Sequence, residues 1–373
     1  MWTPKWLGIA LQTCTLAVCL MACSVIGVSA PEGAGVAQAP GNPTTQAEQI
    51  PLFVPLSVAA IDPVNARSLA PSKAINYQGM SGFIWLPDDQ GAALAGEQGL
   101  VLLSTTEAAF GAQASTPEAI QEIVSATPSL LNVAQEAAVL AWVSEGITVN
   151  VLDVTVNRVE PIITQSASPV TGLALTPSGD HVAYATFSGQ VVTQKPGDEQ
   201  NALFWTAPAW LANLSYSPDG AQLAGADLAN FILYFLDAKT GAVVRSQEWS
   251  ESPTPALRGV YLSPDWSQAA WVAQGAVQLM DADTGLTGPL LLHQNVVNAI
   301  TWSPDSRLLA IAAAAMVNNT LEPAVLVWDA NSGELVNTIV QSYAVQALAF
   351  SPDGRQLAVL NTNGDLQTWS VSR

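Results

Sequence analysis

One sequence frame recurs seven times along most of this chain, and it limits the possible folds more than any other feature. The copy in residues 345–371 is the clearest, with three short segments of alternating apolar and polar residues separated by two turn signals. The first signal is Pro352-Asp353-Gly354, and the second spans residues 361–364. Alternating segments bounded by turn residues predict an antiparallel meander of strands.

The seven copies align on the residue that opens the first turn. These origins are Pro87, Gln135, Pro177, Pro218, Pro264, Pro304 and Pro352. They follow one another at intervals of 40 to 48 residues, and apolar or aromatic residues stand two and four positions before each. Six positions after each origin stands an alanine, namely Ala93, Ala141, Ala183, Ala224, Ala270, Ala310 and Ala358. This period predicts an all-β fold, a seven-bladed β-propeller whose blades each have four antiparallel strands.

The two ends of the repeat array complement each other. The last copy stops at Val371 after its third strand, and residues 68–76 occupy the place of a fourth strand before the first copy. We therefore expect residues 68–76 to pair with the last blade and to close the ring, which removes exposed sheet edges.

A second turn signal follows the third strand in three copies. It reads Asp237-Ala-Lys-Thr-Gly241, Asp281-Ala-Asp-Thr-Gly285 and Asp329-Ala-Asn-Ser-Gly333. The pattern predicts a type I turn that ends in a left-handed glycine and leads into the fourth strand.

These motifs resemble those of the WD-repeat β-propeller family. The resemblance covers residues 61–373 and rests on the Ser-Pro-Asp-Gly turns and on Val-Leu-Val-Trp328-Asp329. Residues 61–69 also look like the lead-in to the first blade in many bacterial WD-repeat proteins. No Gly-His pair precedes a first strand and Trp-Asp occurs once, so the family's buried hydrogen-bonded tetrad is not carried over. The resemblance implies architecture, whereas function has to come from a site.

The N-terminal residues indicate export and anchoring. Residues 7–22 form an apolar run of signal-peptide length that ends in Leu20-Met21-Ala22-Cys23, which resembles the lipobox of bacterial lipoproteins. We expect residues 1–22 to be a signal peptide and Cys23 to carry the lipid; an ordinary cleaved signal with an incidental cysteine is the alternative. No cysteine follows Cys23, as suits an oxidising compartment. The predicted location is extracytoplasmic, at the outer face of the cell membrane or in the periplasm.

Composition sets the remaining domain boundaries. Residues 23–49 are rich in proline, glycine and alanine and predict a flexible tether from lipid to domain. Residues 50–60 form a possible extra edge strand, and residues 61–373 form the propeller.

Charge narrows the class of partner. The chain has 30 acidic and 11 basic residues, a formal net charge of −19, which disfavours nucleic acid and anionic lipid as partners. A requirement for solubility is enough to explain this excess of acidic residues. Binding of a cationic partner or of Ca²⁺ is the more specific alternative explanation.

No residue pattern indicates catalysis. The chain has two histidines, no nucleophile motif, no phosphate loop and no cluster with metal-ligand spacing. The aspartates Asp219, Asp265, Asp305 and Asp353 recur at one repeat position and are interpreted as turn residues. We therefore expect no enzyme, no catalytic residue, no cofactor and no metal.

Departures from the repeat mark the candidate binding loops. Trp205, Trp210, Glu248, Trp249 and Glu251 fall near connections between the fourth strand of one blade and the first strand of the next. These connections should share one rim, and the enlarged connection in residues 312–323 should lie on the same face. Exposed tryptophans beside glutamates suit a protein-binding rim; packing of the tryptophans between blades is the alternative. Residues 111–128 form another insertion, expected to be helical around residues 117–125.

Together these features predict a monomeric, membrane-anchored extracytoplasmic propeller that acts as a non-catalytic protein–protein interaction scaffold for an unidentified protein partner. A small-ligand sensor or enzyme that uses the channel mouth for a glycan, Ca²⁺ or a quinone is the alternative.

Overall fold

The computed structural model describes residues 59–71, 74–87, 91–97, 99–104, 121–122, 128–156, 158–163, 168–198, 202–249 and 257–371. The predicted signal peptide, the tether, Cys23 and Glu251 lie outside these residues. Of the possible edge strand at residues 50–60, only Ala59 and Ala60 are described, and neither belongs to a strand. No helix in the described ranges is long and apolar enough to cross a membrane.

The strands form seven antiparallel sheets, each of which is one blade. Blade 1 contains β3 (Met80–Trp85), β4 (Gly91–Gly96), β5 (Gly99–Ser104) and β6 (Gln121–Glu122). Blade 2 contains β7 (Pro128–Val133), β8 (Val139–Ser144), β9 (Thr148–Asp153) and β10 (Arg158–Ile163). Blade 3 contains β11 (Val170–Leu175), β12 (Val182–Thr186), β13 (Gln190–Gln194) and β14 (Ala202–Thr206). Blade 4 contains β15 (Ala212–Tyr216), β16 (Gln222–Asp227), β17 (Ile232–Asp237) and β18 (Val243–Glu248).

The remaining blades follow the same plan. Blade 5 contains β19 (Gly259–Leu262), β20 (Gln268–Ala273), β21 (Ala276–Asp281) and β22 (Thr287–Leu292). Blade 6 contains β23 (Gln294–Trp302), β24 (Leu308–Val317), β25 (Thr320–Asp329) and β26 (Leu335–Val340). Blade 7 contains β27 (Val345–Phe350), β28 (Leu357–Asn361) and β29 (Asp365–Val371), joined by β1 (Leu69–Pro71) and β2 (Ile75–Asn76).

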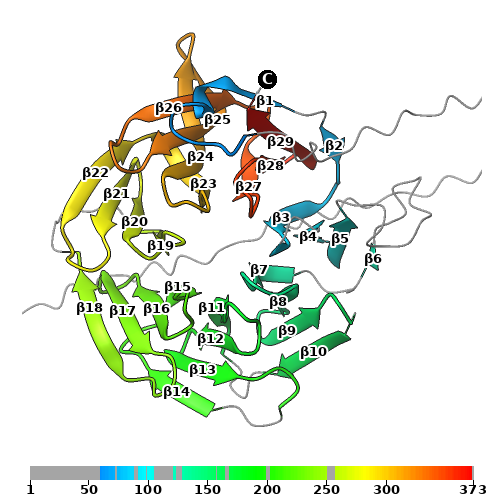
Figure 1. Cartoon of the computed structure of the whole chain (residues 1–373), viewed down its shortest axis with the longest axis vertical. Coiled ribbons are helices and arrows are strands. Elements are labelled where there is room, and N and C mark those ends of the chain that lie inside the picture. Colours follow the sequence, from blue (N-terminus) through cyan, green and yellow to red (C-terminus); the bar gives the residue numbers. More distant parts are fainter. Residues whose placement is uncertain are drawn as a thin grey trace, which may run out of the picture. The chain divides into compact units, whose positions relative to one another are not determined.

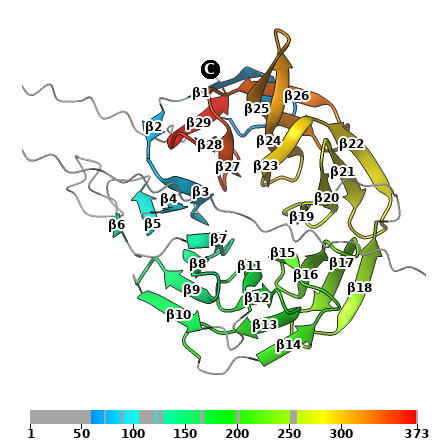
Figure 2. The ribbon, with the colours of Figure 1, turned by 180° about the vertical axis from the view of Figure 1, so that it is seen from behind.

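The blades stand in a ring, and we call the region at its centre the channel (Figure 1). The first strand of each blade lies nearest the channel, and Figure 2 shows the same order from behind. We call the four strand positions of a blade A to D, from the channel outwards. The predicted seven-bladed propeller of four-stranded blades is confirmed.

The ring closes as the sequence predicts. β1 pairs antiparallel with β29 through Leu69↔Val371, and β2 continues along the same strand through Ile75↔Leu366. A short 3-10 helix, η1 (Ala66–Ser68), precedes β1. The lead-in before it is fixed to blade 7, because the amide of Ile61 donates to the carbonyl of Gly354 at 2.8 Å. Ile61 is buried against blades 6 and 7, and burial of such a side chain contributes about 2 kcal/mol.

The core lies between neighbouring blades. The alanine column Ala93, Ala141, Ala183, Ala224, Ala270, Ala310 and Ala358 is fully buried at 0% exposure in every blade. Larger side chains from adjacent sheets fill the space around it; one cluster joins blade 1 to blade 2 through Ala93, Leu140 and Trp142. Close packing explains why alanine recurs, since a larger residue at a filled position forces its neighbours apart.

The helix expected around residues 117–125 is wrong where the structure describes that segment. Gln121 and Glu122 form β6, which pairs with β5 through Val101↔Glu122. Pairing with an exposed sheet edge overrides the local helical preference of this segment. The residues on either side of β6 lie outside the described ranges.

Candidate functional site

The antiparallel strand order gives the ring two different rims. In the part of the chain that the structure describes, the A–B and C–D connections lie at one end of their blades, and we call this end the turn rim. It includes residues 134–138, 176–181, 217–221, 238–242, 263–267, 282–286, 303–307, 330–334 and 351–356. The B–C and D–A connections lie at the opposite end, which we call the loop rim. Among the described residues it includes 145–147, 187–189, 207–211, 228–231, 249, 257–258, 274–275, 293, 318–319, 341–344 and 362–364.

On the turn rim, the recurring aspartates of the A–B connections bind their own turns. In blade 4, the hydroxyl of Ser217 donates to Oδ1 of Asp219 at 2.6 Å, and the amide of Ala221 donates to the same oxygen at 3.0 Å. The hydrogen bond from Ser217 is the main reason why the pKa of Asp219 is lowered. The same serine–aspartate bond recurs in blades 5, 6 and 7 at Asp265, Asp305 and Asp353. These carboxylates have the structural role that the repeat predicts.

The aspartates of the C–D connections likewise accept hydrogen bonds from their own turns. Oδ1 of Asp329 accepts the amides of Asn331 and Ser332 at 2.9 and 3.0 Å, and Gly333 closes the turn with φ +72°. A Cβ at Gly333 would lie 2.6 Å from Cβ of Pro289 in the preceding blade. The glycine therefore meets two needs, a left-handed backbone and a close approach to the neighbouring sheet.

Two of the predicted tryptophans near the loop rim pack into the structure. Trp205 lies on β14 and meets Tyr234 edge to face, with ring centroids 5.1 Å apart. Trp249 follows β18 and meets Trp271 in the same way at 5.3 Å. Both tryptophans are half-buried, whereas Glu248 at the end of β18 is exposed. Packing between neighbouring elements therefore accounts for these two indoles.

Trp210 has a different environment. It lies in the connection from blade 3 to blade 4 and stacks on Phe187 from the B–C turn of blade 3, with centroids 6.2 Å apart and planes 19° apart. Phe187 is 61% exposed. Sequence reasoning missed Phe187; the signal was an aromatic residue inside the short turn Phe187-Ser188-Gly189. The pair presents an aromatic surface beside the channel.

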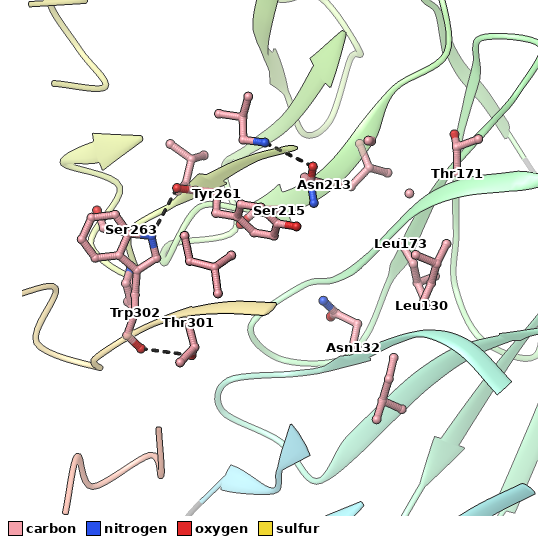
Figure 3. Close-up of a pocket in the computed structure, with 18 of the residues that line it drawn as sticks. Leu130, Asn132, Thr171, Leu173, Asn213, Ser215, Tyr261, Ser263, Thr301 and Trp302 are labelled. Carbon is pink, nitrogen blue, oxygen red and sulfur yellow. Dashed lines mark hydrogen bonds between the residues drawn. The ribbon is translucent and has the colours of Figure 1, made fainter. Parts of the chain in front are cut away.

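Trp210 also lines a cavity of about 610 Å³ in the channel. The A strands of blades 2 to 6 provide most of its wall, and Figure 3 shows the amides of Asn132 and Asn213 among hydroxyl-bearing side chains. Both amides join neighbouring A strands, since Asn132 accepts the amide of Leu175 at 3.1 Å and Asn213 accepts that of Val260 at 3.3 Å.

The backbone of this wall is strained at two equivalent positions. Leu130 and Asn213 each stand five residues before a repeat origin, and their φ angles are +50° and +51°. The pairing register of β7 and of β15 shifts beside these residues. Similar register shifts occur between the A and B strands of blades 1, 3, 6 and 7, so this irregularity belongs to the repeated framework.

The enlarged B–C connection of blade 6 is a projecting hairpin. β24 and β25 each have ten residues and extend past the neighbouring strands (Figure 1). Asn318 and Asn319 turn the chain with φ +50° and +64°, as a tight hairpin requires. Near the tip, Met316 is 59% and Leu321 is 50% exposed.

No group of three or more metal-ligating side chains that could hold an ion occurs in the described ranges. Of the two histidines, His293 is buried, and His181 is exposed with Nδ1 3.3 Å from Oδ1 of Asp180.

No protein-family model matches this chain, and no curated protein matches it. Among solved structures, the chain is similar to one described as the crystal structure of the beta-propeller domain of Myceliophteria thermophila Cps50 (Swd1). The TM-score is 0.66 at 14% identity, and the match covers 82% of this chain and 100% of the other. This likeness establishes the fold, a WD-repeat-like seven-bladed propeller.

Proposed function

We propose that this protein is a membrane-anchored, extracytoplasmic scaffold that binds a protein partner through its loop rim and does not catalyse a reaction. The observation that carries the proposal is the stacked pair at the channel mouth, formed by the exposed Phe187 and the half-buried Trp210. Aromatic residues are enriched at the centres of protein interfaces, where a rigid ring buries a large area at low entropic cost.

The projecting hairpin also supports the assignment of partner binding to the loop rim. Met316 and Leu321 expose apolar side chains near its tip, and Tyr343 in the next D–A connection is 47% exposed. Methionine adapts its shape to a partner, and its enrichment at interfaces follows from this. The aspartates of the turn rim, by contrast, already accept hydrogen bonds from their own turns.

The test is affinity capture of cross-linked partners from native membranes. The double variant Phe187→Ser/Trp210→Ala should lose the captured protein while its thermal unfolding midpoint stays near that of the wild type. Leu286→Ser is the matched control, because Leu286 is 70% exposed but lies on the turn rim. Capture that survives the double variant and fails with Leu286→Ser would refute the loop-rim assignment.

The anchor is tested separately. Cys23→Ser should move the protein from the membrane to the soluble extracytoplasmic fraction and abolish metabolic labelling with a radioactive fatty acid. Retention of both properties in Cys23→Ser would contradict lipidation at this cysteine.

The channel cavity favours a second candidate function, a sensor of a small ligand. Amide and hydroxyl side chains beside aromatic rings suit a hydroxylated molecule such as a glycan. Thermal unfolding in the presence of sugars, quinones and Ca²⁺ separates the two functions. A saturable stabilisation by one of these that Ser215→Leu abolishes, at unchanged partner capture, would establish the sensor instead.

A further inference from the structure

The A–B turn of blade 3 departs from the turn of the later blades. It reads Thr176-Pro177-Ser178-Gly179-Asp180-His181, so the aspartate stands two positions later than in Ser-Pro-Asp-Gly. This turn borders a groove of about 600 Å³ on the turn rim, which is also lined by the A–B turns of blades 2 and 4 and by the C–D turn of blade 4. The groove lies on the opposite rim from the channel mouth and belongs to no site described above.

Asp180 is held as an anion at the edge of the groove. Its Oδ1 accepts the hydroxyls of Thr176 and Ser178, each at 2.7 Å. These two hydrogen bonds, that of Thr176 first, lower the pKa of Asp180 to about 2. The side chain is 57% exposed, so the second carboxylate oxygen can take a ligand without displacing either hydroxyl.

Tyr216 supplies an independent sign of a ligand. It stands two residues before its repeat origin, as Trp85 and Trp302 do in their blades. Those indoles donate to carbonyls of the preceding blade, at Ala349 and Tyr261, with distances of 3.0 and 3.2 Å. Within the described residues, the hydroxyl of Tyr216 makes no hydrogen bond to another residue. Tyr216 is only 5% exposed, but its hydroxyl is not among the fully buried unpaired atoms, and the residue lines the groove.

The charged side chains that line the groove indicate which class of ligand it would bind. Glu136, Asp180 and Asp219 contribute carboxylates, while Lys239 and His181 are the basic groups that line it. Burial and the negative charge of Asp180 raise the pKa of Tyr216. A protonated phenol keeps lone pairs on its oxygen that can accept a hydrogen bond. The carboxylates do not form a metal-binding group. A planar or tetrahedral organic cation satisfies both a carboxylate and a phenol oxygen.

We propose that this groove binds a guanidinium or primary ammonium group, with Asp180 as the counter-ion and the Tyr216 hydroxyl as hydrogen-bond acceptor. The proposal does not depend on partner binding at the loop rim, because no residue is shared between the two surfaces.

The test is calorimetric titration of the full chain with two cationic probes, agmatine and a capped Gly-Arg-Gly peptide. The matched neutral probe is the same peptide with citrulline in place of arginine. Both cationic probes should bind saturably, and the citrulline peptide should not. Tighter binding of agmatine would assign the site to free amines, and tighter binding of the peptide would assign it to a side chain of a protein.

Three variants locate the binding. Asp180→Asn keeps an acceptor for Thr176 and Ser178 but removes the charge, and should weaken binding about tenfold or more. Tyr216→Phe removes one oxygen and should weaken binding by about fivefold. Asp305→Asn changes a carboxylate in an ordinary A–B turn of blade 6 and should leave the affinity within about twofold.

Thermal unfolding of each variant confirms that it is folded before titration. Equal affinity for the citrulline peptide, equal losses in Asp180→Asn and Asp305→Asn, or no saturable binding by folded wild-type protein would each overturn the proposal.

Discussion

The two rims of the ring use the same strands in opposite ways. On the turn rim, each repeated aspartate binds its own loop, and glycines such as Gly333 press against the preceding blade. On the loop rim, the connections differ from blade to blade, and Phe187 and Met316 expose apolar side chains. Repetition therefore marks residues that hold the framework, and we propose that departures from it mark the residues that meet a partner. The A–B turn of blade 3 follows this rule on the turn rim itself, since its departure coincides with a groove.

The strongest test of this difference between the rims is to replace one glycine on each rim with alanine, which adds the same methyl group at both places. Gly333→Ala adds a Cβ that would lie 2.6 Å from Pro289, at φ +72°. Gly146→Ala, on the loop rim, adds one at φ +75° with no atom within 4 Å. We expect the free energy of unfolding to fall by about 3 kcal/mol in the first variant and about 1 kcal/mol in the second. Chemical denaturation measures both, and equal losses would contradict the packing role of the turn rim.

Removal of one carboxylate from each rim should give a smaller difference in stability. Asp329→Ala removes the acceptor of two backbone amides and should destabilise the protein by about 1 kcal/mol. Glu248→Ala removes an exposed carboxylate near the loop rim and should change stability by less than about 0.5 kcal/mol. Urea unfolding at neutral pH compares them. A larger loss in Glu248→Ala would show that carboxylates of the loop rim also hold the framework.

The pH dependence of stability tests the hydrogen-bonded Asp180 in the A–B turn of blade 3. The folded pKa of Asp180 is about 2, below its ordinary value of 3.8. A lowered carboxylate pKa contributes stability above the unfolded value, and this contribution is lost as the pH falls through the folded value. Between pH 4 and pH 2 the wild type should therefore lose more stability than Asp180→Asn, as measured by the thermal midpoint. Parallel pH profiles would contradict the hydrogen-bonded anion; because the group is exposed, the difference is small.

The smallest effect on stability should come from the proposed partner surface. Phe187 is 61% exposed, so Phe187→Ser should change the free energy of unfolding by less than about 1 kcal/mol. Differential scanning calorimetry measures this change. A loss comparable to that of Gly333→Ala would mean that the aromatic pair serves the framework rather than a partner.

Periodicity predicted most of the fold because it reports which residues face a neighbouring sheet. The blade count, the alanine column and the pairing of residues 68–76 with the last blade all follow from it. β6 escaped prediction because it lies in an insertion with no repeat partner, and its strand state depends on the free edge of β5.

The sites were less accessible to the same reasoning. Trp205 and Trp210 are five residues apart, yet one packs on Tyr234 and the other reaches the channel mouth. Tyr216 stands at the apolar or aromatic position two residues before its repeat origin, but the direction of its hydroxyl depends on the position of the preceding blade. Phe187 stands in a short turn that carries no distinctive motif. Periodicity reports the face of a strand, whereas exposure of one atom depends on contacts between blades.

The pairing of β1 with β29 has a consequence for biogenesis. Blade 7 takes strands from both ends of the described chain, so its sheet cannot form until β29 has been synthesised. Until then the earlier blades present two open edges, and such edges recruit other extended chains. We therefore expect the nascent protein to depend on a holding chaperone until β29 is available, and a truncation before Asp365 should leave that dependence permanent.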